Sequence, residues 1–106
     1  MIGGLIVGPD DGPAAQVLVR GLGPSLASVP NPLPDPIVEL RDVNGVLLAS
    51  NDDWKTNEAE VAATGIPPTN DRESAFVIEL SAGNYTAIVK GKSDTTGVGV
   101  IEVYHL

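Results

Sequence analysis

Residues 37–50 read IVELRDVNGVLLAS and carry the strongest local structure signal in the chain. Two runs rich in β-branched and aliphatic residues flank Asn44-Gly45. An Asn-Gly pair between two β-rich runs predicts a β-hairpin with a type I′ turn, in which both central residues take positive φ. Alternation along the first run places Val38 and Leu40 toward the core and leaves the charged side chains beside them in solvent. This hairpin predicts an antiparallel β fold.

Runs of the same kind recur on both sides of the hairpin, separated by Gly, Pro, Asn and Asp clusters. The spacing between turns, about 8 to 12 residues, is typical of an all-β sandwich. We therefore predict an all-β fold, an antiparallel β-sandwich of jelly-roll or Ig-like type, forming a single domain over residues 1–106. It should contain about seven strands and one short helix. The predicted strands are residues 2–7, 16–22, 37–42, 46–50, 74–80, 85–90 and 98–106.

Two connections have distinctive sequences. Residues 29–36 contain four prolines and should cross in an extended form from one sheet to the other. Residues 55–65 are the one candidate helix, with Asn57 and Glu60 spaced as a capping box and Gly65 as the C-terminal stop. A helix this short is marginal alone, so it must dock, and we expect Val61 and Ile66 to provide the contact.

Composition excludes several classes of partner. Fourteen acidic and six basic residues give a net charge of −8, which argues against a nucleic-acid backbone and against anionic membrane surfaces. No stretch is long enough to span a bilayer, so membrane insertion is not expected. The apolar opening, residues 1–8, lacks a basic region and is too short for a signal peptide. If the protein is extracellular or on the cell surface, its export signal is not in this chain.

The residues needed for catalysis are scarce, so we predict that the chain is not an enzyme. There is no cysteine, and His105, next to the end of the chain, is the one histidine. Residues 21–26 (GLGPSL) superficially resemble a dinucleotide loop, but Pro24 removes an amide donor and no helix follows. The glycines there are better explained by a close backbone approach, and Ser25 as a turn residue.

Calcium is the one cofactor that the sequence favours. It binds six to eight oxygen atoms, usually supplied by loops. Two polar loops, around residues 51–54 and 69–73, supply carboxylate and amide oxygens that would meet if the loops lie at one end of a sandwich. In the alternative interpretation these side chains shape a solvated loop, pair with nearby basic residues, and Trp54 packs against the core edge. The predicted ligands are Asn51, Asp52, Asp53, Asp71 and Glu73.

Several segments together resemble a known family. Residues 17–26 (VLVRGLGPSL) resemble its VLIRALGPSL segment, 35–42 (DPIVELRD) its DPxLELHD, and 49–54 (ASNDDW) its IASNDNW. The later segments ESA, GNYTAIVKG and GVGVIEVYHL match ESAI, PGxYTAIVRG and GVGLVEVYDL. The family is a β-sandwich module, often repeated in tandem, of large secreted or surface-anchored bacterial proteins. A looser similarity links the chain to the bacterial pre-peptidase C-terminal domain, some members of which bind calcium and polymeric substrates.

The resemblance implies no activity, and His105 stands where the family favours Asp. Members of the family carry another segment before the first strand, which implies that this chain has an open edge at which a neighbour's strand could add. Self-association would then involve Ile2, Leu5 and Val7.

The predicted function is that of a non-enzymatic, extracellular structural or adhesive module, part of a longer or tandem-repeat protein. Its expected partners are other copies, neighbouring repeats, a polysaccharide or a surface protein. One alternative is a filament or surface-layer subunit assembled by strand exchange. The other is a calcium-stabilised module that binds carbohydrate or protein.

Overall fold

The computed structural model describes residues 2–7, 14–26 and 28–106, and of residues 2–7 it describes the backbone. The described part is mostly β-structure with one short α-helix, as predicted. Its elements are β1 (Ile2–Val7), β2 (Ala15–Leu22), β3 (Pro36–Asp42), β4 (Leu47–Asn51), a 3₁₀ turn (Trp54–Asn57), α1 (Glu58–Ala63), β5 (Ser74–Leu80), β6 (Gly83–Gly91), a second 3₁₀ turn (Lys92–Asp94) and β7 (Val100–His105).

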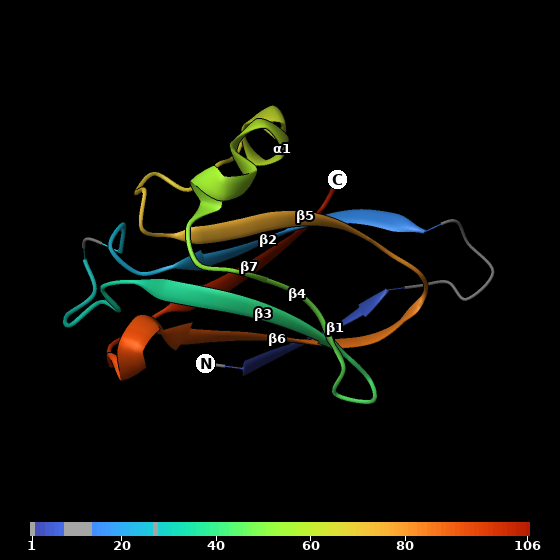
Figure 1. The fold of residues 1–106 in the computed structure, drawn as a ribbon, viewed down its shortest axis with the longest axis horizontal. Helices are drawn as coiled ribbons and strands as arrows, with labels where there is room; N and C mark the ends of the chain where they lie inside the picture. Colours follow the sequence, from blue (N-terminus) through green and yellow to red (C-terminus); the bar gives the residue numbers. More distant parts are fainter. Residues whose placement is uncertain (1, 8–13, 27) are drawn as a thin grey trace.

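The strands form two antiparallel sheets, which Figure 1 shows as two layers. The first sheet has the order β1-β6-β3-β4, and the second has the order β5-β2-β7. The proline-rich residues 29–36 connect β2 of the second sheet to β3 of the first, which confirms the predicted crossover. None of the described helices is long and apolar enough to cross a bilayer.

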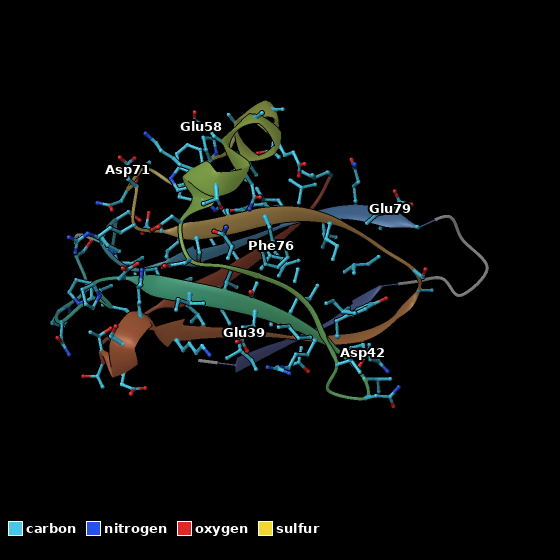
Figure 2. The ribbon with its side chains drawn as sticks, in the orientation of Figure 1. Glu39, Asp42, Glu58, Asp71, Phe76 and Glu79 are labelled. Atoms are coloured by element: carbon cyan, nitrogen blue, oxygen red, sulfur yellow. The ribbon has the colours of Figure 1, made fainter. Side chains whose placement is uncertain are left out.

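The main core lies between the two sheets because strands of both contribute apolar side chains to one cluster. Val38 and Leu40 of β3 are fully buried there, as the alternation in the hairpin predicted. Phe76 of β5 points into the same layer from the opposite sheet (Figure 2). The other buried members of the cluster are Val17, Val19, Leu80 and Ala87.

A second, smaller core covers the outer face of the β5-β2-β7 sheet. Leu18 points away from the main core and is fully buried against Trp54, Val61 and Ala75. Helix α1 therefore lies on this sheet, on the side away from the other sheet (Figure 1). The predicted docking through Val61 is confirmed, whereas Ile66 is exposed and that part of the prediction was wrong.

The start of the helix differs from the predicted capping box. A 3₁₀ turn, Trp54–Asn57, precedes α1, and the Asn57 side chain makes no cap hydrogen bond. Its amide instead donates to the backbone carbonyl of Ala75 at 3.3 Å, so Asn57 ties the turn to β5. Gly65 takes a φ of 80° directly after the helix, which confirms it as the C-terminal stop.

The β3–β4 turn is also not the predicted type I′ turn. Gly45 has a φ of 82°, but Asn44 keeps a negative φ. The Asp42 carboxylate accepts hydrogen bonds from the amides of Asn44 and Val46, both at 2.9 Å, and the Gly45 amide donates to the Asp42 carbonyl. These bonds stabilise a type I turn followed by glycine in the left-handed region.

Candidate functional site

The loop after β4, predicted as half of a metal site, is mainly a structural connection. Asn51 is 7% exposed, and its side-chain oxygen accepts a hydrogen bond from the Ala75 amide at 3.0 Å. Its side-chain nitrogen donates to the Thr56 hydroxyl at 2.9 Å. The Asn51 amide therefore joins the edge strand of one sheet to β5 of the other and to the 3₁₀ turn. Its oxygen is already in use.

Trp54 extends this connection. Its backbone amide donates to the Glu73 carbonyl at 2.9 Å, and its indole N–H donates to the Asn70 carbonyl at 3.1 Å. The ring itself is buried in the second core with Leu18 and Val61. Trp54 thus anchors both the helix and the loop before β5.

Glu73 occupies a site that the sequence did not reveal. Its side chain is fully buried, and its Oε2 accepts hydrogen bonds from the Gly23 amide at 2.8 Å, the Ser25 amide at 3.0 Å and the Ser25 hydroxyl at 2.6 Å. The loop after β2 therefore binds a carboxylate of the same chain. A Cβ at Gly23 would lie 2.0 Å from the Leu33 carbonyl oxygen, so only glycine fits there.

A cluster of three carboxylates forms where the proline-rich crossover meets the loop after β4. One oxygen each from Asp35, Asp52 and Asp53 lie within 4.8 Å of one another. The Oδ2 atom of Asp52 accepts a hydrogen bond from the Lys92 ammonium at 2.7 Å. The Oδ1 atoms of Asp35 and Asp52 are buried and have no hydrogen-bond partner among the described residues.

Of the five predicted calcium ligands, the structure brings only Asp52 and Asp53 into this cluster. Asn51 and Glu73 have the buried partners described above. Asp71 is mostly exposed, pairs with Lys55 at 3.2 Å, and lies at the outer surface beside α1 (Figure 2). Asp35, which sequence reasoning missed, supplies the third carboxylate of the cluster.

Crowding of negative charge sets the electrostatics of the cluster. Burial raises the pKa of Asp35 above its ordinary value, and the neighbouring carboxylates of Asp52 and Asp53 raise it further. Lys92 offsets part of this effect. The hydrogen bond to Asp52 in turn raises the pKa of the Lys92 ammonium. A cation placed among the three carboxylates would relieve the same repulsion.

We predict that Asp35→Asn stabilises the protein at pH 7. Because the pKa of Asp35 is raised by folding, the unfolded chain loses this proton first, and stability falls as pH rises past the ordinary aspartate value of about 3.9. The variant does not lose stability in this way. Its gain in free energy of unfolding over the wild type should therefore shrink toward zero at about pH 3. Urea denaturation at both pH values measures it. Asp71→Asn is the exposed control, and an equal effect of both variants would contradict the prediction.

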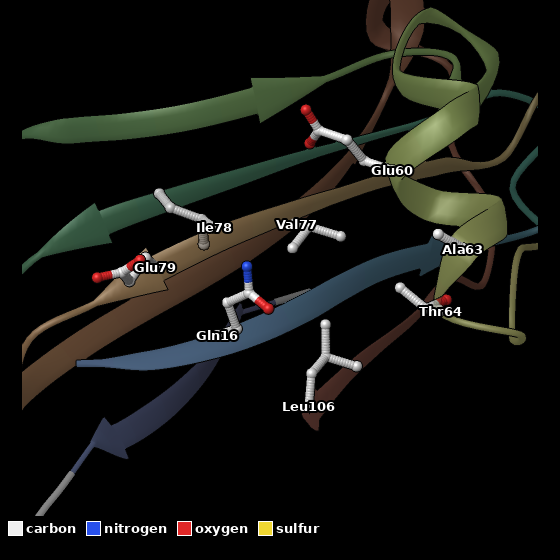
Figure 3. Close-up of a pocket in the computed structure, with 8 residues that line it drawn as sticks. All are labelled: Gln16, Glu60, Ala63, Thr64, Val77, Ile78, Glu79 and Leu106. Atoms are coloured by element: carbon white, nitrogen blue, oxygen red, sulfur yellow. The ribbon is translucent and has the colours of Figure 1, made fainter. Parts of the chain in front are cut away.

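A hollow beside α1 lies on the outer face of the β5-β2-β7 sheet (Figure 3). It combines two carboxylates with an amide, a hydroxyl and aliphatic groups, and no aromatic ring lines it. The Thr64 hydroxyl already donates to the Val61 carbonyl at 2.6 Å. These groups include neither an activated nucleophile nor a base beside one. The lining residues are Gln16, Glu60, Ala63, Thr64, Val77, Ile78, Glu79 and Leu106.

The aromatic side chains are committed to packing. Trp54 and Phe76 are buried. Tyr85 packs against the main core and donates its hydroxyl to the Ser81 carbonyl at 2.6 Å, and the Tyr104 hydroxyl accepts from Arg20 at 3.2 Å. Each of the four aromatic rings therefore packs in or against one of the two core clusters.

Comparison of the chain with protein-family models, with curated proteins and with solved structures finds no match in any of the three.

Proposed function

We propose that this chain is a non-enzymatic structural or adhesive module of an extracellular or cell-surface protein, built as a jelly-roll or Ig-like β-sandwich. The observation that carries the proposal is the use of its distinctive polar residues. The most distinctive loops of the sequence contain Asn51, Trp54 and Glu73. Each of these side chains is buried, and together their hydrogen bonds join β4, β5 and the loop after β2. These loops hold the framework together.

Charge and surface support the same function. The net charge of −8 keeps such a module soluble and suits spacing or display. The hollow beside α1 holds no activated nucleophile, and the aromatic rings pack against the two cores. The partners that we propose are other copies of the chain, neighbouring repeats, a polysaccharide or a surface protein.

The adhesive function is tested by a bead assay. Beads coated with the folded chain should cluster with one another, or adhere to polysaccharide-coated or cell-surface preparations, at physiological salt. Beads coated with heat-denatured chain are the control. Coated beads that stay dispersed against every one of these surfaces would contradict adhesion.

Assembly by strand exchange is favoured by one observation. Strand β1 is one of the two edge strands of its sheet and, among the described residues, pairs only with β6. Exchange of β1 between copies would use the same backbone register, Ile2 opposite Ile88 through Val7 opposite Gly83. Leu5 pairs opposite Tyr85 in that register. The side chains of Ile2, Leu5 and Val7 lie outside the described part of the structure.

Calcium stabilisation is the second candidate, and the unpartnered oxygens of Asp35 and Asp52 favour it. We predict that calcium raises Tm relative to EDTA, because a ligand bound only to the native state stabilises it, by about 2.7 kcal/mol at about 100 times Kd. Asp35→Asn combined with Asp53→Asn should abolish the shift and preserve the Asp52–Lys92 pair. Asp71→Asn should keep the shift. Identical melts with calcium and with EDTA would exclude the site.

A further inference from the structure

Strand β7 leaves one side of the described structure incompletely covered. It is an edge of the three-stranded sheet, which faces a four-stranded one. Val103 of β7 pairs opposite Val19, a fully buried residue of the main core, so both side chains point toward the core. Val103 is nevertheless 39% exposed. A core-facing valine at the sheet edge therefore lacks a cover.

The backbone of β7 also offers hydrogen bonds at this edge. The Leu106 amide donates to the Gln16 carbonyl at 2.9 Å, so residue 106 bonds toward β2. Hydrogen-bonded and non-hydrogen-bonded pairs alternate in an antiparallel ladder. The N–H and C=O groups of Ile101, Val103 and His105 consequently point away from β2. They form a template for one further strand.

We propose that β7 pairs antiparallel with β7 of a second copy, Val103 opposite Val103, and that the two three-stranded sheets join into one of six strands. This inference rests on the proposed function, in which other copies are partners. A two-fold axis through Val103 makes the contact self-complementary. It covers the exposed valine of each copy with that of the other.

Charge selects this register among the possible pairings of β7 with β7 of a second copy. Two chains of charge −8 repel, but β7 carries one acidic residue, Glu102, and Arg20 is paired with it by a salt bridge. With Val103 on the axis, Glu102 lies opposite Tyr104 of the second copy. A shift of the axis to residue 102 would place two glutamates directly opposite each other, which is destabilising. The Val103 register also pairs the whole strand.

The other edges whose side chains are described suit pairing less well. The ladder between β2 and β7 is regular from Leu22–Val100 to Val17–His105. The ladder of the edge strand β4 has an irregularity opposite Leu40 and Arg41, and a bulge of this kind interrupts pairing at an edge. Strand β5, the other edge of the three-stranded sheet, also has a regular ladder, but the Asn51 and Asn57 side chains already bond the amide and carbonyl of its Ala75. Of these three edges, β7 is the one with a regular ladder and no such side-chain bond to its backbone among the described residues.

A single cysteine tests the contact, because the chain contains none. Under mild oxidation Val103→Cys should form a covalent dimer at least about ten times faster than Val46→Cys at equal concentration. Val46 is the matched control, a valine 54% exposed on the β3–β4 hairpin. Urea should remove the difference. Equal rates for the two folded variants would overturn the proposed contact.

Charge substitution supplies a second measurement, which can detect the contact even when the wild-type dimer is weak. Val103→Lys and Val103→Asp should each sediment as monomers, whereas an equal mixture should restore the dimer, since residue 103 faces itself across the axis. Circular dichroism checks that both variants fold. Wild-type chain that stays monomeric at about millimolar concentration, or a mixture that does not associate, would overturn the proposal. If wild-type beads cluster but Val103→Cys cross-links no faster than Val46→Cys, the proposed β7 contact is excluded and the adhesive function is not. Dimers combined with beads that stay dispersed against every surface tested would contradict adhesion instead.

Discussion

Glu73→Ala is expected to lower the free energy of unfolding by about 2 to 4 kcal/mol. The buried carboxylate accepts three hydrogen bonds, from the Gly23 amide and from the amide and hydroxyl of Ser25. Its removal leaves the buried Gly23 amide and the partly buried donors of Ser25 without their acceptor, and each unsatisfied buried group costs about 1 to 3 kcal/mol. The loss is a large share of the 5 to 15 kcal/mol typical of a domain.

The position of Gly23 makes the effect extend beyond one loop. Its Cα lies against the Leu33 carbonyl so closely that no side chain fits, and Leu33 belongs to the crossover between the sheets. Release of the loop after β2 should therefore loosen the crossover as well. Urea denaturation followed by tryptophan emission measures the loss.

Two variants separate this interpretation from a general effect of removing a charge. Glu79 lies on β5, the strand that follows Glu73, and is exposed, so Glu79→Ala should change the free energy of unfolding by no more than about 0.5 kcal/mol. Glu73→Gln keeps one acceptor oxygen and should fall between Glu73→Ala and the wild type. A Glu73→Ala protein as stable as Glu79→Ala would show that the carboxylate does not hold the loop.

The sequence predicted those features that depend on neighbours along the chain. Val38 and Leu40 follow the two-residue period of a strand, and both are buried. Gly65 ends the helix because the left-handed conformation needed there suits glycine. The proline-rich crossover was predicted because proline has no backbone N–H group to donate within a helix or a central strand. Each of these depends on a local rule.

The errors arose where a hydrogen bond to a group outside the short motif changes the local outcome. Asp42 binds the amides of the turn and thereby favours a type I geometry over the type I′ turn that Asn44-Gly45 alone indicates. Asn57 has the spacing of a helix cap, but the Ala75 carbonyl of β5 takes its side-chain hydrogen bond. Local propensity was overridden by tertiary contacts in the second case.

The candidate site shows the same limit more strongly. Nothing in the pattern links Glu73 to Gly23 and Ser25, about fifty residues earlier, or Asp35 to Asp52. These pairs meet because the crossover and the loops that join the sheets converge, and that convergence depends on the register of the whole fold. The sequence therefore pointed to the loop at residues 51–54, but the neighbours of its oxygen atoms depend on contacts that no local pattern specifies.

Trp54→Ala is expected to have the largest effect of any single substitution discussed, a loss of about 3 to 5 kcal/mol. The ring fills the second core with Leu18 and Val61, and its removal leaves a cavity beneath a helix of only six residues. Such a helix is not stable without its tertiary contacts. The substitution also removes the indole N–H that holds the Asn70 carbonyl.

Trp54→Phe distinguishes the volume of the ring from its hydrogen bond. Phenylalanine keeps most of the buried apolar surface but has no N–H group, so we expect a smaller loss, about 1 to 2 kcal/mol. Circular dichroism must follow the unfolding, because both variants lack the one tryptophan. The control is Ile66→Ala, next to the helix but exposed, which should change little. If Trp54→Ala costs no more than Ile66→Ala, the helix does not depend on the ring, and the loop at residues 51–54 is not the structural connection that its contacts indicate.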